Sequence, residues 1–306
     1  MLKILINILI AGVAGQFGLA QVEGNQTIEQ INPVVLGVEE SGLPVRINDV
    51  NQGLKLTAKS AIVVDKNTGK VLFEKNPDLR LSVASISKLA TVLVFLDQEI
   101  DWDKVVFTQG DDYVGGAQLK IGLGESLTVR DLFYASLVGS ANNAVVALVR
   151  ATEMDDKEFM IEMNKKAKAL GMNETYFAEP TGLNMVNRST ATDLAKLMKA
   201  VFRQEEIVKA LNMKSYSFKT LNTNRWVSIQ NTDKLLSSFL NNGDGYKVLG
   251  GKTGYTLEAG HCLVAGVQGK EGQEIIAVVL GAGSAAARFQ EMKGLAWWVF
   301  ENWQWR

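Results

Sequence analysis

Short hydrophobic runs with a two-residue period lie near both ends of the chain and predict β-strands there. Residues 60–64 and 70–74 flank a segment rich in Asp, Asn, Thr and Gly, which is typical of a turn, so together they predict a hairpin. After residue 245 the two-residue period returns. It predicts three more strands, over residues 247–252, 255–267 and 274–281.

The middle of the chain, from about residue 85 to residue 245, carries hydrophobic residues mostly at helical spacing. Thr128 and Asp131 fit a capping box, which predicts that one helix begins there. A final helix is expected over residues 285–303, and its apolar stripe predicts packing against the sheet. Further helices are predicted over residues 85–97, 142–151, 155–170, 190–202 and 205–213.

This order of elements predicts a mixed α/β (α+β) fold over residues 57–306. Strands from the N-terminal and C-terminal parts would form one antiparallel sheet flanked by helices, with a helical lobe inserted in its middle. Residues 1–20 combine a positive charge, an apolar stretch and small final residues, which predicts a cleaved signal peptide, with a retained anchor or a buried helix as alternatives. Residues 21–56 are polar and contain two prolines, which predicts an extended leader.

Composition narrows the function classes. The 306 residues include 32 Lys and Arg against 33 Asp and Glu, and no basic run, which argues against nucleic acid as the main partner. The chain has one His, His261, and one Cys, Cys262, so it lacks the residues for an internal disulfide, a Cys-rich metal site or a multi-histidine metal centre. A hydrolase of this composition is expected to use a base other than histidine.

The segment Ser85-Ile86-Ser87-Lys88 places a hydroxyl three residues before an amine. If a helix begins at Ser85, both side chains lie on one face. A serine hydroxyl needs a base that takes its proton, and Lys88 is the candidate if burial and a second cation lower its pKa. The helix N-terminus would also offer N–H groups to an oxyanion. Taken alone the pattern is weak, because a solvated lysine on a helix is the common alternative.

Two further motifs carry polar side chains. Ser140-Ala141-Asn142 lies between two predicted helices, where both side chains could point into one cleft, although an ordinary helix cap is the alternative and Asn143 could take the role of Asn142. The third motif, Lys252-Thr253-Gly254, lies in the segment 250–255, which begins a late strand. The glycines of this segment, Gly254 among them, would let a ligand backbone approach the strand edge. An exposed turn is the alternative there.

The three motifs occur in the order typical of penicillin-binding proteins and class A β-lactamases. From about residue 57 to residue 300 the sequence resembles the low-molecular-weight penicillin-binding proteins, which are serine-type D-alanyl-D-alanine carboxypeptidases. The resemblance includes EPTGLN at residues 179–184, NTDKLL at residues 231–236 and Arg288-Phe289 in the last helix. It implies a β-lactamase/transpeptidase-like fold and a catalytic domain over residues 57–306.

The resemblance also implies roles for the motif residues. Ser85 would be the acylated nucleophile and Lys88 its base. Ser140 would relay a proton toward the leaving amine, and Asn142 would hydrogen-bond the substrate peptide.

For the third motif, the resemblance implies that Lys252 sets the electrostatics beside Ser140 and that Thr253 receives the terminal carboxylate of the substrate. Gly254 and Tyr255 complete the substrate-binding strand. The backbone N–H groups of Ser85 and Tyr255 would form the oxyanion hole.

Two positions depart from the family pattern. Asn143 stands where relatives commonly have Asp, and Glu179 stands where they commonly have Asn. Glu179 invites comparison with the deacylating Glu of β-lactamases, but it precedes Asn184 by five positions rather than four. We therefore expect Glu179 to be a loop residue.

The expected function is an exported enzyme, periplasmic or otherwise extracytoplasmic, that trims the D-Ala-D-Ala ends of peptidoglycan stem peptides during cell-wall biogenesis and is acylated by β-lactams. No metal, organic cofactor or nucleic acid is expected, and the chain is expected to be a monomer that contacts the membrane only through a retained N-terminal segment. A D,D-endopeptidase of cross-linked peptidoglycan, a β-lactamase and a non-catalytic peptidoglycan-binding protein are the alternatives.

Overall fold

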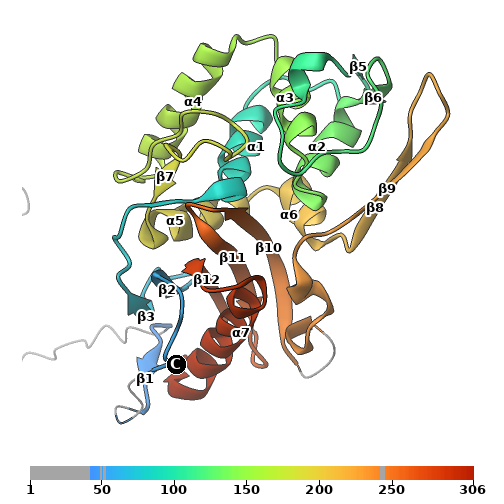
Figure 1. Cartoon of the computed structure of the whole chain (residues 1–306). Helices are drawn as coiled ribbons and strands as arrows, with labels where there is room; N and C mark the ends of the chain where they lie inside the picture. Colours follow the sequence, from blue (N-terminus) through green and yellow to red (C-terminus); the bar gives the residue numbers. More distant parts are fainter. Residues whose placement is uncertain (1–41, 49, 51–52, 242–244) are drawn as a thin grey trace, which may run out of the picture. The chain divides into compact units, whose positions relative to one another are not determined.

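The computed structural model describes residues 42–48, 50, 53–241 and 245–306 (Figure 1). The predicted signal peptide, residues 1–20, and residues 21–41 of the predicted leader lie outside the described residues. Among the helices of the described part, none is both long enough and apolar enough to cross a membrane.

A five-stranded antiparallel sheet combines strands from both ends of the compact unit Ser41–Arg306 (Figure 1). Its strand order is β10-β11-β12-β2-β3, and the pair β12–β2 joins the two distant parts of the sequence. The predicted antiparallel sheet is therefore confirmed. The strands are β2 (Ser60–Asp65), β3 (Val71–Lys75), β10 (Lys247–Thr256), β11 (Gly260–Gln268) and β12 (Glu274–Ala282).

Both faces of this sheet are buried, which explains why its central strands are apolar almost throughout. In β12, Ile276 and Val278 belong to one hydrophobic core, whereas Ile275 and Val279 belong to another. Successive side chains of a strand point to opposite faces, so one strand serves both cores. The first core lies on the side of the helical lobe, and the second lies under α7 (Ala285–Asn302).

Helix α7 packs on one face of the sheet, as its apolar stripe predicts (Figure 1). Ser284 caps the helix, because its hydroxyl accepts a hydrogen bond from the backbone N–H of Ala287 at 3.0 Å. The stripe that lies in the second core consists of Phe289, Met292, Leu295 and Val299.

Helices and 3₁₀ turns fill most of the chain between β3 and β10. The predicted capping box at Thr128 is confirmed: its hydroxyl accepts from the N–H of Asp131 at 3.1 Å, and the Asp131 carboxylate accepts from the N–H of Thr128 at 3.2 Å. The elements are η1 (Ala84–Ser87), α1 (Lys88–Leu96), η2 (Gly110–Asp112), α2 (Val129–Val138), α3 (Asn142–Arg150), α4 (Asp156–Ala169), α5 (Ala191–Val201), α6 (Glu205–Asn212), η3 (Lys234–Ser237) and η4 (Phe239–Asn241).

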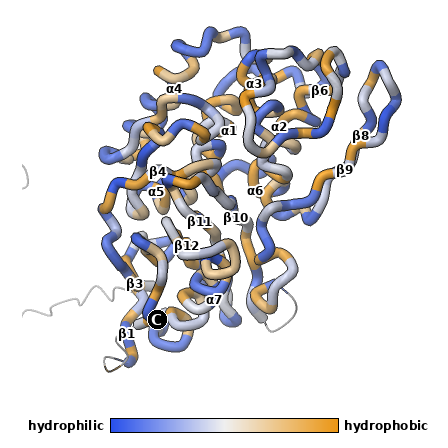
Figure 2. The backbone as a smooth tube through the Cα atoms, viewed as in Figure 1, coloured by the Kyte–Doolittle hydropathy of each residue, from blue (hydrophilic) through white to orange (hydrophobic). Residues whose placement is uncertain are grey.

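Short two-stranded pairs complete the described structure. They are β1 (Val45–Arg46) with β13 (Trp303–Gln304), β4 (Leu81–Ser82) with β7 (Arg188–Ser189), β5 (Val105–Phe107) with β6 (Ser126–Thr128), and β8 (Ser215–Lys219) with β9 (Trp226–Gln230). The β8–β9 hairpin projects from the helical lobe, and its tip is mostly hydrophilic (Figure 2). The prediction of a mostly helical middle missed this hairpin, because each of its strands is only five residues long and largely exposed.

The strand predicted over residues 255–267 is wrong in its boundaries. A turn separates β10 from β11, so Tyr255 lies near the end of β10 instead of beginning the next strand. The backbone N–H of Ala259 donates to the Thr256 hydroxyl at 3.1 Å, and Gly260 adopts a φ of +66°, which a residue with a Cβ rarely adopts.

The described residues of the predicted leader belong to the compact unit Ser41–Arg306. Strand β1 pairs with β13 at the other end of the chain. Leu56 is buried in the second core, and Leu54 packs against it. The structure thus places the described residues of the leader beside the C-terminal part of the chain.

Candidate active site

Ser85 and Lys88 lie where η1 continues into α1. Ser85 is in the 3₁₀ turn, and Lys88 is the first residue of the α-helix. The Lys88 ammonium donates a hydrogen bond to the Ser85 hydroxyl at 2.7 Å. The spacing of three residues thus places both groups on one face, as the sequence predicts.

Lys88 is fully buried, which is rare for a lysine. Besides Ser85, its Nζ donates to Asn142 Oδ1 at 2.7 Å and to the Thr181 carbonyl at 2.5 Å. Burial lowers the pKa of Lys88 well below its ordinary value, and the positive charge of Lys252 lowers it further, whereas Glu179 acts in the opposite direction. The lowered pKa favours the neutral amine, which can accept a proton from its neighbour.

Lys252 is the second buried lysine of the site. Its Nζ donates to the Ser140 hydroxyl at 2.7 Å and to the Thr253 carbonyl at 3.1 Å. Burial, followed by the charge of Arg288, lowers the pKa of Lys252 to about 7. Ser140 is held in a left-handed conformation with φ of +58°, a strained backbone of the kind that gathers at functional sites.

Asn142 begins α3, and it links three parts of the site. Neither it nor Ser140 is the residue that caps the helix, because Ala141 occupies the cap position and makes no side-chain cap. The Asn142 amide donates to the Gly115 carbonyl at 2.8 Å while its oxygen accepts from Lys88. Asn143 makes different contacts. Its side-chain oxygen accepts from the N–H of Leu119 at 2.8 Å, and its side-chain nitrogen donates to the Leu119 carbonyl at 2.9 Å.

Strand β10 brings the third motif against η1. A Cβ placed on Gly254 would lie 2.8 Å from the Val83 carbonyl oxygen and 3.2 Å from the Ser85 nitrogen, so only glycine allows this approach. The Thr253 hydroxyl donates to the Thr232 hydroxyl at 2.7 Å. Tyr255 is half-exposed and stacks on His261, with ring centroids 4.4 Å apart.

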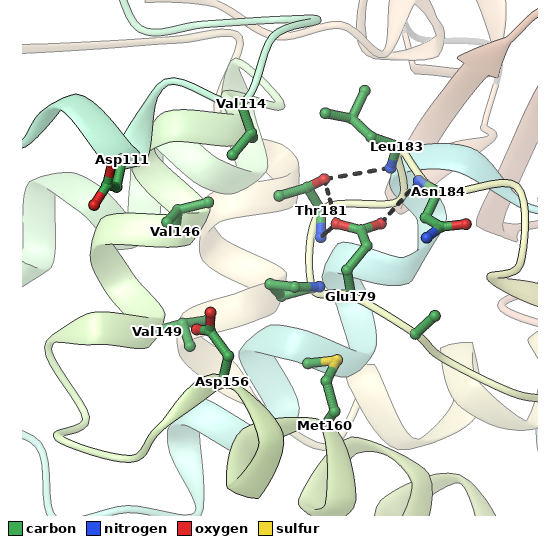
Figure 3. Close-up of a pocket in the computed structure, with 12 residues that line it drawn as sticks. Asp111, Val114, Val146, Val149, Asp156, Met160, Glu179, Thr181, Leu183 and Asn184 are labelled. Atoms are coloured by element: carbon green, nitrogen blue, oxygen red, sulfur yellow. Dashed lines mark hydrogen bonds between the residues drawn. The ribbon is translucent and has the colours of Figure 1, made fainter.

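Figure 3 shows the loop around Glu179, whose Thr181 carbonyl contacts Lys88. The Glu179 carboxylate accepts hydrogen bonds from the backbone N–H groups of Thr181 at 2.7 Å, Gly182 at 2.6 Å and Asn184 at 3.2 Å. These contacts occupy the carboxylate within its own loop, and the loop in turn presents the Thr181 carbonyl to Lys88. The interpretation of Glu179 as a loop residue is confirmed.

Asp233 and Arg288 flank the third motif, and sequence reasoning gave neither of them a role. Arg288 donates to the Gly254 carbonyl at 3.0 Å. One Asp233 oxygen accepts from the N–H of Leu235 at 2.9 Å, while the other is buried without a hydrogen-bond partner among the described residues. Burial raises the pKa of Asp233 to about 6. Both residues lie in segments that resemble the family, and this resemblance is the signal in the sequence that could have indicated a role for them.

Asp233→Asn is expected to raise the free energy of unfolding at neutral pH. The folded-state pKa of about 6 lies above the ordinary 3.8, so the native state binds more protons between these values and wild-type stability falls as the pH rises through them. The neutral variant keeps the acceptor for Leu235 and avoids this loss, which amounts to up to about 3 kcal/mol. Urea unfolding at about pH 4 and about pH 7.5 measures it. A difference between variant and wild type that is the same at both pH values would contradict the prediction.

A family model for D-alanyl-D-alanine carboxypeptidases of the peptidase S11 group matches residues 47–284. A D-alanyl-D-alanine endopeptidase of Pseudomonas aeruginosa is 35% identical over 230 residues, which cover 74% of this chain and 69% of that protein. The carboxypeptidase DacF of Bacillus subtilis is 34% identical, with 81% of this chain and 63% of that protein covered. The chain thus spans less than two thirds of the length of DacF.

Two solved structures are similar to this chain in both fold and sequence. The Streptomyces K15 DD-transpeptidase has a TM-score of 0.74 and 29% identity, with 81% of this chain and 99% of that chain covered. Penicillin-binding protein D2 of Listeria monocytogenes, in its cefotaxime-bound form, has a TM-score of 0.70 and 30% identity over the same shares. The fold and the matched sequence together show that the chain belongs to the peptidase S11 family of serine D-alanyl-D-alanine peptidases.

Proposed function

We propose that the protein is a D-Ala-D-Ala carboxypeptidase that trims peptidoglycan stem peptides through an acyl-enzyme on Ser85. The observation that carries the proposal is the 2.7 Å hydrogen bond between Ser85 and a fully buried Lys88. Family membership supports the reaction class, and the other motif residues surround this pair.

In the acylation step, neutral Lys88 takes the proton of Ser85 while Oγ attacks the carbonyl carbon of the penultimate D-alanine. The N–H groups of Ser85 and Tyr255 stabilise the oxyanion. Ser140 relays this proton from Lys88 to the leaving nitrogen as the amide bond breaks, which releases D-alanine, leaves an ester on Ser85 and returns Lys88 to its neutral form. Water then hydrolyses the ester and regenerates the hydroxyl. No metal ion or organic cofactor takes part in these steps.

Three residues hold the substrate in this scheme. Asn142 hydrogen-bonds the peptide on the acyl side, and Thr253 receives the terminal carboxylate. Lys252, beside Ser140, supplies positive charge that attracts this carboxylate and lowers the pKa of Lys88. Gly254 lets the substrate backbone lie against β10.

A D,D-endopeptidase that cuts cross-links with the same residues is the second candidate. Two relatives are named D-alanyl-D-alanine endopeptidase, one from Pseudomonas aeruginosa and one from Escherichia coli. They are 35% and 34% identical to this chain, respectively. Purified cell-wall fragments distinguish the two activities. Release of free D-alanine from pentapeptides supports the carboxypeptidase, and release of monomers from cross-linked dimers supports the endopeptidase.

Penicillin is expected to form one covalent adduct, on Ser85, because its strained amide resembles the D-Ala-D-Ala bond. Intact-protein mass spectrometry followed by peptide mapping measures the adduct, and Ser85→Ala should abolish both the adduct and the release of D-alanine. An adduct on another residue, or no adduct at all, would refute the assignment of Ser85 as the nucleophile. A long-lived adduct argues against a β-lactamase. A Ser85→Ala protein that keeps all biological activity would instead indicate a non-catalytic binding protein.

Thr253→Ala is expected to lower kcat/KM for a peptide that ends in a free carboxylate by about 10- to 100-fold, the value of one hydrogen bond to a charged group. The same peptide with a C-terminal amide should lose much less. Release of the terminal residue from the two peptides gives the comparison. Equal losses would show that Thr253 does not read the carboxylate.

We further propose that the enzyme acts outside the cytoplasm as a monomer in cell-wall biogenesis, with residues 1–20 as an export signal and membrane contact only through a retained N-terminal segment. The family's cell-wall substrates support an extracytoplasmic location. N-terminal sequencing of the protein from fractionated cells tests the export signal. A protein that begins at residue 1 in the cytoplasmic fraction would contradict it.

A further inference from the structure

Asp233 is a buried carboxylate that lies against the strand of the third motif. Only 3% of the residue is exposed. One of its oxygens accepts from the N–H of Leu235, and the other has no hydrogen-bond partner among the described residues. A Cβ placed on Gly251 would collide with this second oxygen, so the carboxylate lies directly on β10. A buried oxygen without a partner costs free energy, and its presence calls for an explanation.

Strand β10 separates this carboxylate from the ammonium of Lys252. The Cβ direction of Gly251 points to Asp233. Successive side chains of a strand point to opposite faces, so Lys252, the next residue, points the other way, to the Ser140 hydroxyl. The carboxylate and the ammonium therefore lie on opposite faces of the same strand.

Hydrogen bonds fix the segment that carries Asp233 to the third motif. The N–H of Asp233 donates to the Asn231 side-chain oxygen at 2.8 Å, and the Asn231 amide donates to the Met213 carbonyl at 2.8 Å. The Thr232 hydroxyl accepts from the Thr253 hydroxyl at 2.7 Å. The carboxylate is thus held in one place relative to Lys252.

The charged groups that act on Asp233 are the cations Lys252 on β10 and Arg288 on α7. Lys234, its neighbour in the sequence, is exposed. Burial and the charge of Arg288 lower the pKa of Lys252, whereas Asp233 raises it. On the active-site side of β10, Lys252 in turn lowers the pKa of Lys88. Asp233 therefore opposes the two influences that remove the charge of Lys252.

We propose that Asp233 is a positioning residue that keeps Lys252 in its charged form, so that the ammonium attracts the terminal carboxylate of the substrate at neutral and mildly alkaline pH. Asp233 contacts neither the substrate nor Ser85 in this scheme, because it acts through Lys252. A negative charge across one strand, in an interior of low dielectric, favours the ammonium over the neutral amine. The inference rests on the proposed function, and it explains why a carboxylate that lowers stability occupies this position.

The pH profile of kcat/KM tests the proposal, with D-alanine release from a peptide that ends in D-Ala-D-Ala as the readout. Activity requires neutral Lys88 and charged Lys252, so we expect a bell-shaped profile whose alkaline limb reports Lys252. Asp233→Asn removes the negative charge, which lowers the pKa of Lys252, so the alkaline limb should move to lower pH by about 0.5–1 pH unit. On that limb kcat/KM should fall about 3- to 10-fold.

The same peptide with a C-terminal amide tests whether the charge acts on the carboxylate. Asp233→Asn should reduce its turnover on the alkaline limb less than that of the free acid, because the amide offers no negative charge to Lys252. Urea unfolding verifies that the variant is folded. Equal losses for the two peptides would overturn the assigned role.

Asp65→Asn is the matched control. Asp65 is also a buried carboxylate of the sheet, but its oxygens accept from the Thr68 N–H and the Trp305 indole, both at 2.7 Å. This variant should keep the alkaline limb of wild-type protein. An unmoved limb in Asp233→Asn, or the same shift in Asp65→Asn, would overturn the inference. Absence of D-alanine release by wild-type protein at every pH would instead refute the proposed function.

Discussion

Lys88→Ala is expected to slow the acylation of Ser85 by penicillin by about 10²–10⁴-fold or more. A positioned general base contributes about this factor, and the loss of the amine also removes the hydrogen bond that orients the serine hydroxyl. Stopped-flow or time-resolved mass spectrometry of the penicilloyl adduct measures the rate. Lys165→Ala, at an exposed lysine of α4, is the control and should acylate like wild-type protein.

Burial of the Lys88 ammonium is expected to lower the free energy of unfolding. Its folded-state pKa lies well below the ordinary value of 10.5, so the cost of burying the ammonium is fully present at low pH and is lost as the pH rises toward that value. Lys88→Met, which keeps the length of the side chain, should therefore unfold at a higher temperature than wild-type protein near neutral pH. Comparable acylation rates in the Lys88 variants and wild-type protein would refute the base.

Gly182→Ala is expected to disrupt both the fold and the active site. Gly182 has a φ of +87°, and an added Cβ would lie 2.8 Å from the backbone nitrogen of Ser85 and still closer to the Ala84 carbonyl. Both neighbours are backbone atoms of η1, so the turn that carries Ser85 would have to move. We expect a loss of more than about 4 kcal/mol of stability, the range reached by severe steric mutations. Slower acylation should accompany it.

Gly171→Ala separates steric clash from backbone strain. Gly171 also has a positive φ, +70°, but a Cβ there would meet no atom within 4 Å. Its variant should lose only about 1–2 kcal/mol, the cost of a left-handed alanine. Urea unfolding of both variants, with penicillin acylation of each, provides the comparison. Similar small losses in the two variants would show that the Glu179 loop does not press against η1.

Local sequence patterns predicted much of the fold. The β2–β3 hairpin, the capping box at Thr128 and the apolar stripe of α7 each depend on residues close in sequence, whose spacing sets which side chains share a face. The β8–β9 hairpin and the turn after Tyr255 were missed or misplaced. Short exposed strands have little hydrophobic pattern, and one glycine among apolar residues does not reveal a left-handed turn.

The active site, like the fold, was predicted from the sequence only in part. The sequence by itself determined which groups could do the chemistry, because Ser85 and Lys88 are one helical turn apart and the single histidine leaves lysine as the candidate base. Only the tertiary structure decided that Lys88 and Lys252 are both buried, that the Glu179 carboxylate is occupied by its own loop, and that Asn142 accepts a hydrogen bond from Lys88. Burial and close approach depend on contacts between segments far apart in the chain, such as β10 against η1, and no local pattern encodes those distances.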